Sequence, residues 1–201
     1  MRCGLRCVGD LQLAVRVTLF ALALSVPHAV YASATERPTE ELRNLVVKAV
    51  NEAGSFRDRF EAEVWLMDMA GRLKKKVPDA QQRLELLKLV HFEATRVNLP
   101  PELVLAVIDV ESNFNSWAIS VVGARGLMQI MPFWLQEIGR PHDNLFRPET
   151  NVRMGCTILR YYLDKERGDL TRALGRYNGS LGQTKYPNLV FNALRVRWFR
   201  Q

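Results

Sequence analysis

An apolar segment that ends in a carboxylate constrains the fold more than any other part of this chain. Residues 101–112 read Pro-Glu-Leu-Val-Leu-Ala-Val-Ile-Asp-Val-Glu-Ser, which predicts a buried helix with Pro101 in its first turn. Val104, Val107 and Ile108 share the face of Glu111 at helical spacing. A carboxyl on such a face is costly unless it is protonated or paired, so we expect either a raised pKa or a buried salt bridge to an arginine.

The segment that follows this helix combines turn residues with polar and apolar side chains. A raised pKa at Glu111 would suit a general acid working near neutral pH, and such an acid needs a substrate beside it. Gly123 and Gly126 allow sharp turns and close approach of a ligand to the backbone. Hydrogen-bonding groups and adaptable apolar surface, suited to the hydroxyls and ring faces of a sugar, come from Ser120, Met128, Gln129 and Met131.

Three separated motifs resemble those of the soluble lytic transglycosylases. They are Glu-Ser at 111–112, Gly-Leu-Met-Gln at 126–129 followed by Met-Pro at 131–132, and Tyr-Asn at 177–178 in a helix containing Ala-Leu. All three occur in the family's order and approximate spacing within residues 86–199. The resemblance implies a mainly α, lysozyme-like transglycosylase domain, that is, α+β with minimal β.

The resemblance also implies a reaction and a set of site residues. Glu111 would be the catalytic acid and base that cleaves the bond between N-acetylmuramic acid and N-acetylglucosamine without water, leaving 1,6-anhydromuramic ends. Tyr177 is expected to hydrogen-bond Glu111 or the acetamido group of the sugar. The implied substrate-binding residues are Ser112, Ser120, Met128, Gln129, Met131, Tyr177 and Asn178.

A hydrolytic glycosidase normally needs a second carboxylate on the other side of the scissile bond. Asp109 lies about 200° round the helix from Glu111 and should point away. Glu137 and Asp143 belong to none of the motifs. The sequence therefore favours a single-acid mechanism, while a hydrolytic muramidase and a non-catalytic peptidoglycan-binding scaffold stay open as alternatives.

The N-terminus is typical of an export signal. Arg2, Arg6 and Arg16 precede the apolar run at 17–26, and small residues follow at Ala32 and Ala34. We expect a signal peptide at 1–32, or an uncleaved anchor, and a periplasmic location. With a net charge of +7, an exported chain suits an acidic polymer such as peptidoglycan glycan strands, and no nucleic acid.

Beyond the signal, helical periodicity predicts an N-terminal extension at 33–80 and a catalytic domain at 81–201. The extension has one apolar stripe at Phe56, Phe60, Val64 and Met67. We expect helices at 81–97, 151–165, 170–177 and 189–199, a loop at 141–148, and a short extended element within 117–130. No cofactor or metal is expected, because Cys156 and His91 have no partners at metal-ligand spacing. We expect a monomer; the sequence names no partner in the cell envelope.

Overall fold

The computed structural model describes residues 40, 44–47, 54–56 and 58–199. The predicted signal peptide lies outside these residues. Residues 37–201 belong to one compact unit. The predicted boundary between an extension at 33–80 and a catalytic domain at 81–201 stays a prediction.

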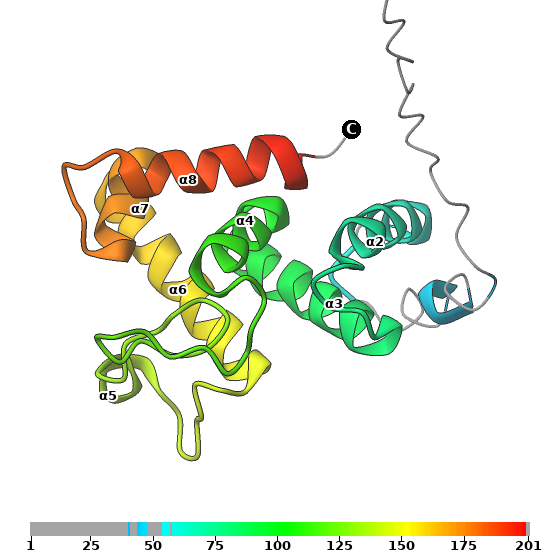
Figure 1. The fold of residues 1–201 in the computed structure, drawn as a ribbon, viewed down its shortest axis with the longest axis horizontal. Helices are drawn as coiled ribbons and strands as arrows, with labels where there is room; N and C mark the ends of the chain where they lie inside the picture. Colours follow the sequence, from blue (N-terminus) through cyan, green and yellow to red (C-terminus); the bar gives the residue numbers. More distant parts are fainter. Residues whose placement is uncertain (1–39, 41–43, 48–53, 57, 200–201) are drawn as a thin grey trace, which may run out of the picture. The chain divides into compact units, whose positions relative to one another are not determined.

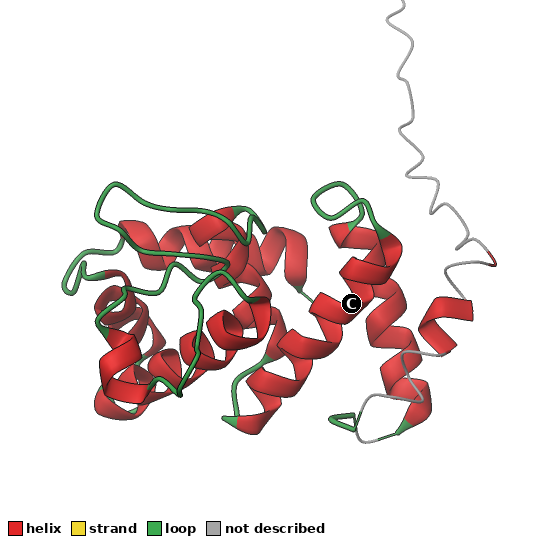
Figure 2. Cartoon of the chain, turned by 90° about the horizontal axis from the view of Figure 1, so that it is seen from below, coloured by secondary structure: helices red, strands yellow, loops and turns green. Residues whose placement is uncertain are grey.

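The described part of the chain is built from helices and loops, without a strand (Figures 1 and 2). This confirms the prediction of a mainly α fold with minimal β structure. In chain order the elements are α2 (Arg59–Leu73), α3 (Ala80–Arg96), α4 (Pro101–Ser112), α5 (Trp134–Ile138), α6 (Pro148–Lys165), α7 (Leu170–Asn178), α8 (Lys185–Ala193) and the π-helical turn η1 (Leu194–Trp198).

Helix α4 is the central element, as its apolar sequence predicted. Every residue from Leu103 to Asp109 is buried, and the helix contacts α3, α8 and η1 (Figure 1). Pro101 occupies its first turn, and Asn113 ends it in the left-handed conformation with φ of 51°. Because neighbours cover most of its surface, the last turn delivers Glu111 to a fixed place.

The other predicted helices are present, with shifts at their starts. The helix predicted at 81–97 is α3, and that predicted at 170–177 is α7. Two others begin earlier than predicted: α6 at Pro148 instead of residue 151, and α8 at Lys185 instead of residue 189. Each has a proline in its first turn, where a missing N–H costs nothing. The predicted loop at 141–148 therefore ends at Arg147.

The apolar stripe predicted at Phe56, Phe60, Val64 and Met67 is right for Phe56 and Met67, which pack against the core, and wrong for the other two residues. Phe60 and Val64 are 78% and 44% exposed. The buried face consists instead of Ala62, Trp65, Leu66, Met69, Ala70 and Leu73. Trp65 anchors this face because its indole Nε1 donates to Glu102 Oε1 of α4 over 2.8 Å. This face packs against α3 and η1.

The segment between α4 and α5 is a loop that folds back on itself. The extended element predicted there is reduced to two isolated bridges, Ile119 with Arg125 and Arg125 with Ile130. Gly126 adopts φ of +77°, and a Cβ atom there would lie 2.3 Å from Asn151 Nδ2. Only glycine therefore fits at this turn.

The Asn151 side chain of α6 anchors this loop by hydrogen bonds to the backbone. Its Nδ2 donates to the carbonyl oxygens of Arg125 and Leu145 over 2.8 and 2.7 Å. Its Oδ1 accepts from the backbone N–H of Met128 over 2.7 Å. The side chain is 1% exposed and satisfies two backbone groups of the loop that carries the second motif and one of the loop before α6.

We expect Asn151→Ala to lower the free energy of unfolding by at least about 3 kcal/mol, because three buried polar groups lose their partner. Chemical denaturation measures this loss. Asn188→Ala, at an exposed position on α8, is the control and should change stability by less than about 0.5 kcal/mol. Equal effects of the two variants would contradict the buried role of Asn151.

Candidate active site

Glu111 lies in the last turn of α4 with a strongly shifted ionisation. Burial raises the pKa of its carboxyl to about 7 from an ordinary value of 4.5, and a hydrogen bond from Tyr186 opposes this rise. Among the residues that the structure describes, Glu111 forms no ion pair. Of the two outcomes predicted for this carboxyl, the raised pKa is therefore the one found. Glu111 is poised to give and accept a proton near neutral pH.

Two tyrosines from the C-terminal helices complete the surroundings of Glu111. The Tyr186 hydroxyl, from the first turn of α8, donates to Glu111 Oε1 over 2.6 Å. The Tyr177 hydroxyl, near the end of α7, donates to the carbonyl oxygen of Met128 over 2.8 Å. Burial, and then the charge of Glu111, raise the pKa of both phenols well above 10, so both stay protonated donors. Tyr186, and not the predicted Tyr177, is the tyrosine bonded to the acid.

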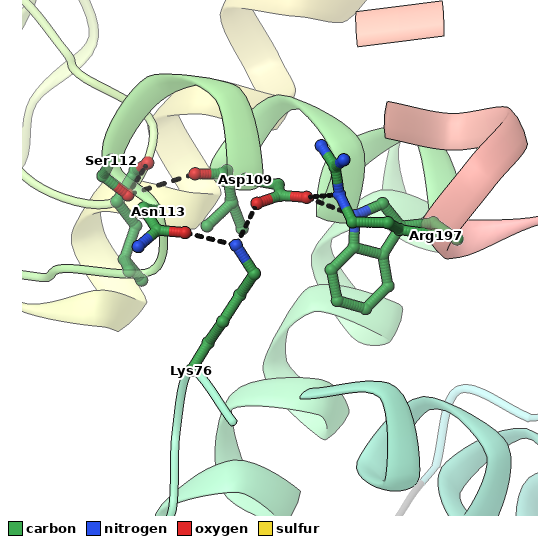
Figure 3. A network of polar contacts seen from close by, with 8 residues as sticks. Lys76, Asp109, Ser112, Asn113 and Arg197 are labelled. Atoms are coloured by element: carbon green, nitrogen blue, oxygen red, sulfur yellow. Dashed lines mark hydrogen bonds and ion pairs between the residues drawn. The ribbon is translucent and has the colours of Figure 1, made fainter. Parts of the chain in front are cut away.

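Asp109, two residues before Glu111, shows the opposite behaviour (Figure 3). It accepts from Lys76 Nζ at 2.6 Å, Arg197 Nε at 2.5 Å and Trp198 Nε1 at 3.0 Å. Burial raises the pKa of Asp109, but these three donors outweigh burial and hold the pKa below its usual range. Asp109 thus joins α4 to the end of α2 and to η1, and it stays ionised.

The other two carboxylates considered as partners are also placed away from this chemistry. Asp143 accepts from Arg153 Nη2 at 2.5 Å and from the Arg140 backbone N–H at 2.7 Å, so it closes its own loop. Glu137 lies on α5 and is exposed. Among the described residues, neither Asp143 nor Glu137 forms a hydrogen bond with Glu111, which agrees with a site that contains a single acid.

Most of the predicted substrate-binding side chains hold the loop in shape. The Ser112 hydroxyl lies 2.7 Å from the Leu127 carbonyl oxygen and donates to it. The Gln129 amide donates to the carbonyl oxygens of Gly126 and Ala118. The Ser120 hydroxyl accepts from the Ala124 backbone N–H at 3.0 Å. These bonds occupy donors and acceptors that the sequence analysis assigned to a sugar.

The Met128 side chain is not available to a ligand. Its side chain is 0% exposed, and its sulfur packs so closely on Gly155 of α6 that a Cβ there would lie 2.3 Å away. Met128 therefore contributes its backbone, not its side chain, to the site. The structure joins Tyr177 to Met128 by a hydrogen bond and Ser112 to the neighbouring Leu127, and it places Tyr177 near enough to Glu111 for the charge of Glu111 to act on the phenol. Met131 is half-buried and Asn178 is exposed, and no polar contact joins either side chain to these residues.

Tyr186, Asn151 and the partners of Asp109 were missed by the sequence analysis. A signal for Tyr186 was available: Thr184 is an N-cap residue type, and Pro187 fits the first turn of a helix. Placing the start of α8 there would have put Tyr186 beside the third motif. Nothing comparable marks Asn151 or Lys76, because their partners come from segments distant in the sequence.

Comparisons with known proteins identify a family and several relatives. Residues 88–189, just over half of the chain, match the family described as "Transglycosylase SLT domain". The transglycosylase of Enterobacteria phage PRD1 is 38% identical over 103 residues, which cover 51% of this chain and 38% of the phage protein. The membrane-bound lytic murein transglycosylase C of Yersinia pestis (strain Pestoides F) is 33% identical over 112 residues, covering 48% of this chain and 31% of that protein.

The chain therefore belongs to the SLT transglycosylase-domain family, which confirms the family and the lysozyme-like fold that its motifs indicated. It spans less than two fifths of the length of these two relatives. Across the described residues, no helix has both the length and the apolar character needed to cross a membrane.

We expect the half-buried Glu111 carboxyl to make stability depend on pH. Its folded pKa lies above its ordinary value, so its contribution is complete below pH 4.5 and is lost as the pH rises through 7. Glu111→Gln cannot titrate. Its free energy of unfolding, relative to the wild type, should rise by up to roughly 3 kcal/mol between pH 4.5 and 8. Denaturant titrations across that range measure it, with exposed Glu63→Gln as the flat control.

We expect Tyr186→Phe to raise the pKa of Glu111 above 7, because it removes the one bond that favours the ionised form. Carbon-13 NMR titration of the Glu111 carboxyl measures the shift. Tyr177→Phe is the matched control, since its hydroxyl bonds Met128 and leaves the Tyr186 contact intact. An unchanged or lower pKa in Tyr186→Phe would show that this hydrogen bond does not form in solution.

Proposed function

We propose that this protein is a peptidoglycan lytic transglycosylase with Glu111 as its sole acid and base. The carrying observation is a half-buried carboxyl with a pKa of about 7 that has a neutral hydroxyl, and no cation, as its partner among the described residues. The printed names of two family relatives, a transglycosylase and a lytic murein transglycosylase, support the same reaction class.

In the proposed cycle, protonated Glu111 donates its proton to the glycosidic oxygen between N-acetylmuramic acid and N-acetylglucosamine. The acetamido oxygen of the substrate stabilises the anomeric carbon. The carboxylate then accepts the proton of the muramic 6-hydroxyl, whose oxygen attacks that carbon and closes a 1,6-anhydro ring. A pKa near ambient pH serves both proton transfers, and Tyr186 keeps the carboxyl oriented throughout.

The absence of a second free carboxylate beside Glu111 argues against water as the nucleophile. Asp109 and Asp143, among the described residues, hold cations and backbone groups. The muramic 6-hydroxyl is already tethered to the reacting sugar, so its attack loses little further freedom. We extend the proposal to an exported, periplasmic enzyme acting on glycan strands during wall remodelling or turnover, without a cofactor. The signal peptide on which export depends lies outside the described residues.

Digestion of purified peptidoglycan sacculi, followed by mass spectrometry of the fragments, tests this proposal. We expect 1,6-anhydromuramic ends, about 18 Da lighter than hydrolysed ends because no water is added. Glu111→Gln should lose roughly 10²–10⁴-fold in rate, the usual share of general acid–base catalysis. Exposed Glu63→Gln serves as the control and should keep the wild-type rate.

Each alternative has its own outcome in the same digest. Fragments with only reducing, water-opened ends would make the protein a muramidase. Binding to sacculi without any released fragment would make it a scaffold. Either result would overturn the proposed lyase reaction.

A further inference from the structure

A groove of about 510 Å³ lies between α5 and α6. Four aromatic rings line it: Phe133 and Trp134 at the start of α5, and Tyr161 and Tyr162 near the end of α6. None of the three motifs contributes a side chain to this groove. The single-acid mechanism assigns no role to this groove.

Two of the four rings are exposed and the other two are half-buried. Phe133 and Tyr161 are 52% and 51% exposed. Trp134 and Tyr162 are half-buried and meet edge to face, with ring centroids 6.3 Å apart. Each exposed ring packs on its neighbour, Phe133 on Trp134 at 5.1 Å and Tyr161 on Tyr162 at 5.3 Å. Clustered exposed aromatic surface of this kind marks a binding site more often than a stability device.

Polar groups of both signs edge the aromatic surface. Glu137 of α5 and Lys165 of α6 line the groove, and Lys165 Nζ lies 5.6 Å from the centroid of the Tyr161 ring. Aromatic faces with a few polar groups at their margin are the usual composition of a small-molecule site. A pyranose ring matches it, since its apolar face stacks on an aromatic ring while its hydroxyl and amide groups reach polar side chains.

The groove is also connected to the surroundings of Glu111. Tyr162, on its floor, lies close enough to Tyr177 to influence the ionisation of that phenol, and Glu111 does so too. On the other wall, Phe133 follows Met131 and Pro132 of the second motif directly in sequence. The groove therefore lies near Tyr177, which in turn lies near Glu111.

We propose that this aromatic groove is a second carbohydrate site, which holds an N-acetylated aminosugar of the glycan strand away from the bond that Glu111 cleaves. It rests on the proposed function in one respect, the identity of the polymer. The mixed charge of its edge fits an uncharged sugar better than a run of like charges. An apolar protein segment is the competing occupant, and the test separates the two.

Binding is measured in the full-length Glu111→Gln protein, which keeps the site and does not consume the ligand. Phe133→Ala and Tyr161→Ala should each weaken binding to N-acetylglucosamine oligomers and to purified sacculi about five- to tenfold, because each removes one stacking face. Phe92→Ala is the matched control: that ring is also 52% exposed but lies on α3, outside the groove. It should leave affinity unchanged.

Conservative variants separate a binding role from a structural one. Tyr161→Phe keeps the ring and should keep the affinity that Tyr161→Ala loses. In the catalytically competent protein, Phe133→Ala should raise KM for sacculi and leave kcat near its wild-type value. Thermal melting should be the same for all variants, since both rings are half exposed.

The outcomes distinguish this inference from the proposed function. If the wild type releases fragments from sacculi but Phe133→Ala and Tyr161→Ala bind sugars like Phe92→Ala, the groove is not a carbohydrate site. If the wild type releases none, the proposed reaction fails, while a loss of oligomer binding in the two groove variants still supports the site. A loss of kcat with unchanged KM and affinity would also overturn the inference.

Discussion

The environment of α4 gives opposite properties to two carboxyls two residues apart, and the chemistry of this protein depends on that contrast. Asp109 accepts from a lysine, an arginine and an indole, so its charge is compensated inside the fold. Glu111 is bonded to one neutral hydroxyl, so burial dominates and its pKa rises to about 7. Environments that drive two carboxyl pKa values apart are a common way of assigning one of them to acid chemistry.

The two carboxyls are also coupled mechanically. Near the C-terminal end of α4, Asp109 binds Lys76 and Arg197, and Glu111 accepts a hydrogen bond from Tyr186 of α8. Ser112 fastens the same end to the Leu127 carbonyl group, and Asn151 fastens the loop of Leu127 to α6. The hydrogen bonds of Asp109, Tyr186, Ser112 and Asn151 therefore fix Glu111 relative to the loop and to both tyrosines. Such fixation limits the reorganisation needed for proton transfer.

The sequence predicted what depends on local pattern and missed what depends on distant contacts. The central helix, the acid and the mainly helical fold followed from periodicity and motifs within single segments. The predicted stripe failed at Phe60 and Val64 because the face of α2 that is buried is the one packed against α3 and η1, and those contacts come from other segments. Tyr186 and Lys76 were missed because each reaches its carboxylate across 75 and 33 positions of sequence. The choice between Tyr177 and Tyr186 required knowing where α8 begins.

The motif residues mainly stabilise the loop between α4 and α5. Ser112, Gln129 and Tyr177 all donate to backbone carbonyl groups of the loop between α4 and α5, and Met128 fills the core beneath it. These residues therefore fix the conformation of that loop and the position of Glu111. Under the proposed function, sugar recognition is then left to surfaces that the motifs do not use. Backbone groups of the loop are one such surface, and exposed aromatic side chains are the other. The rings of the α5/α6 groove take no part in the hydrogen bonds around Glu111, Ser112 and Tyr177. A change in those rings therefore leaves these hydrogen bonds of the proposed acid and its loop intact.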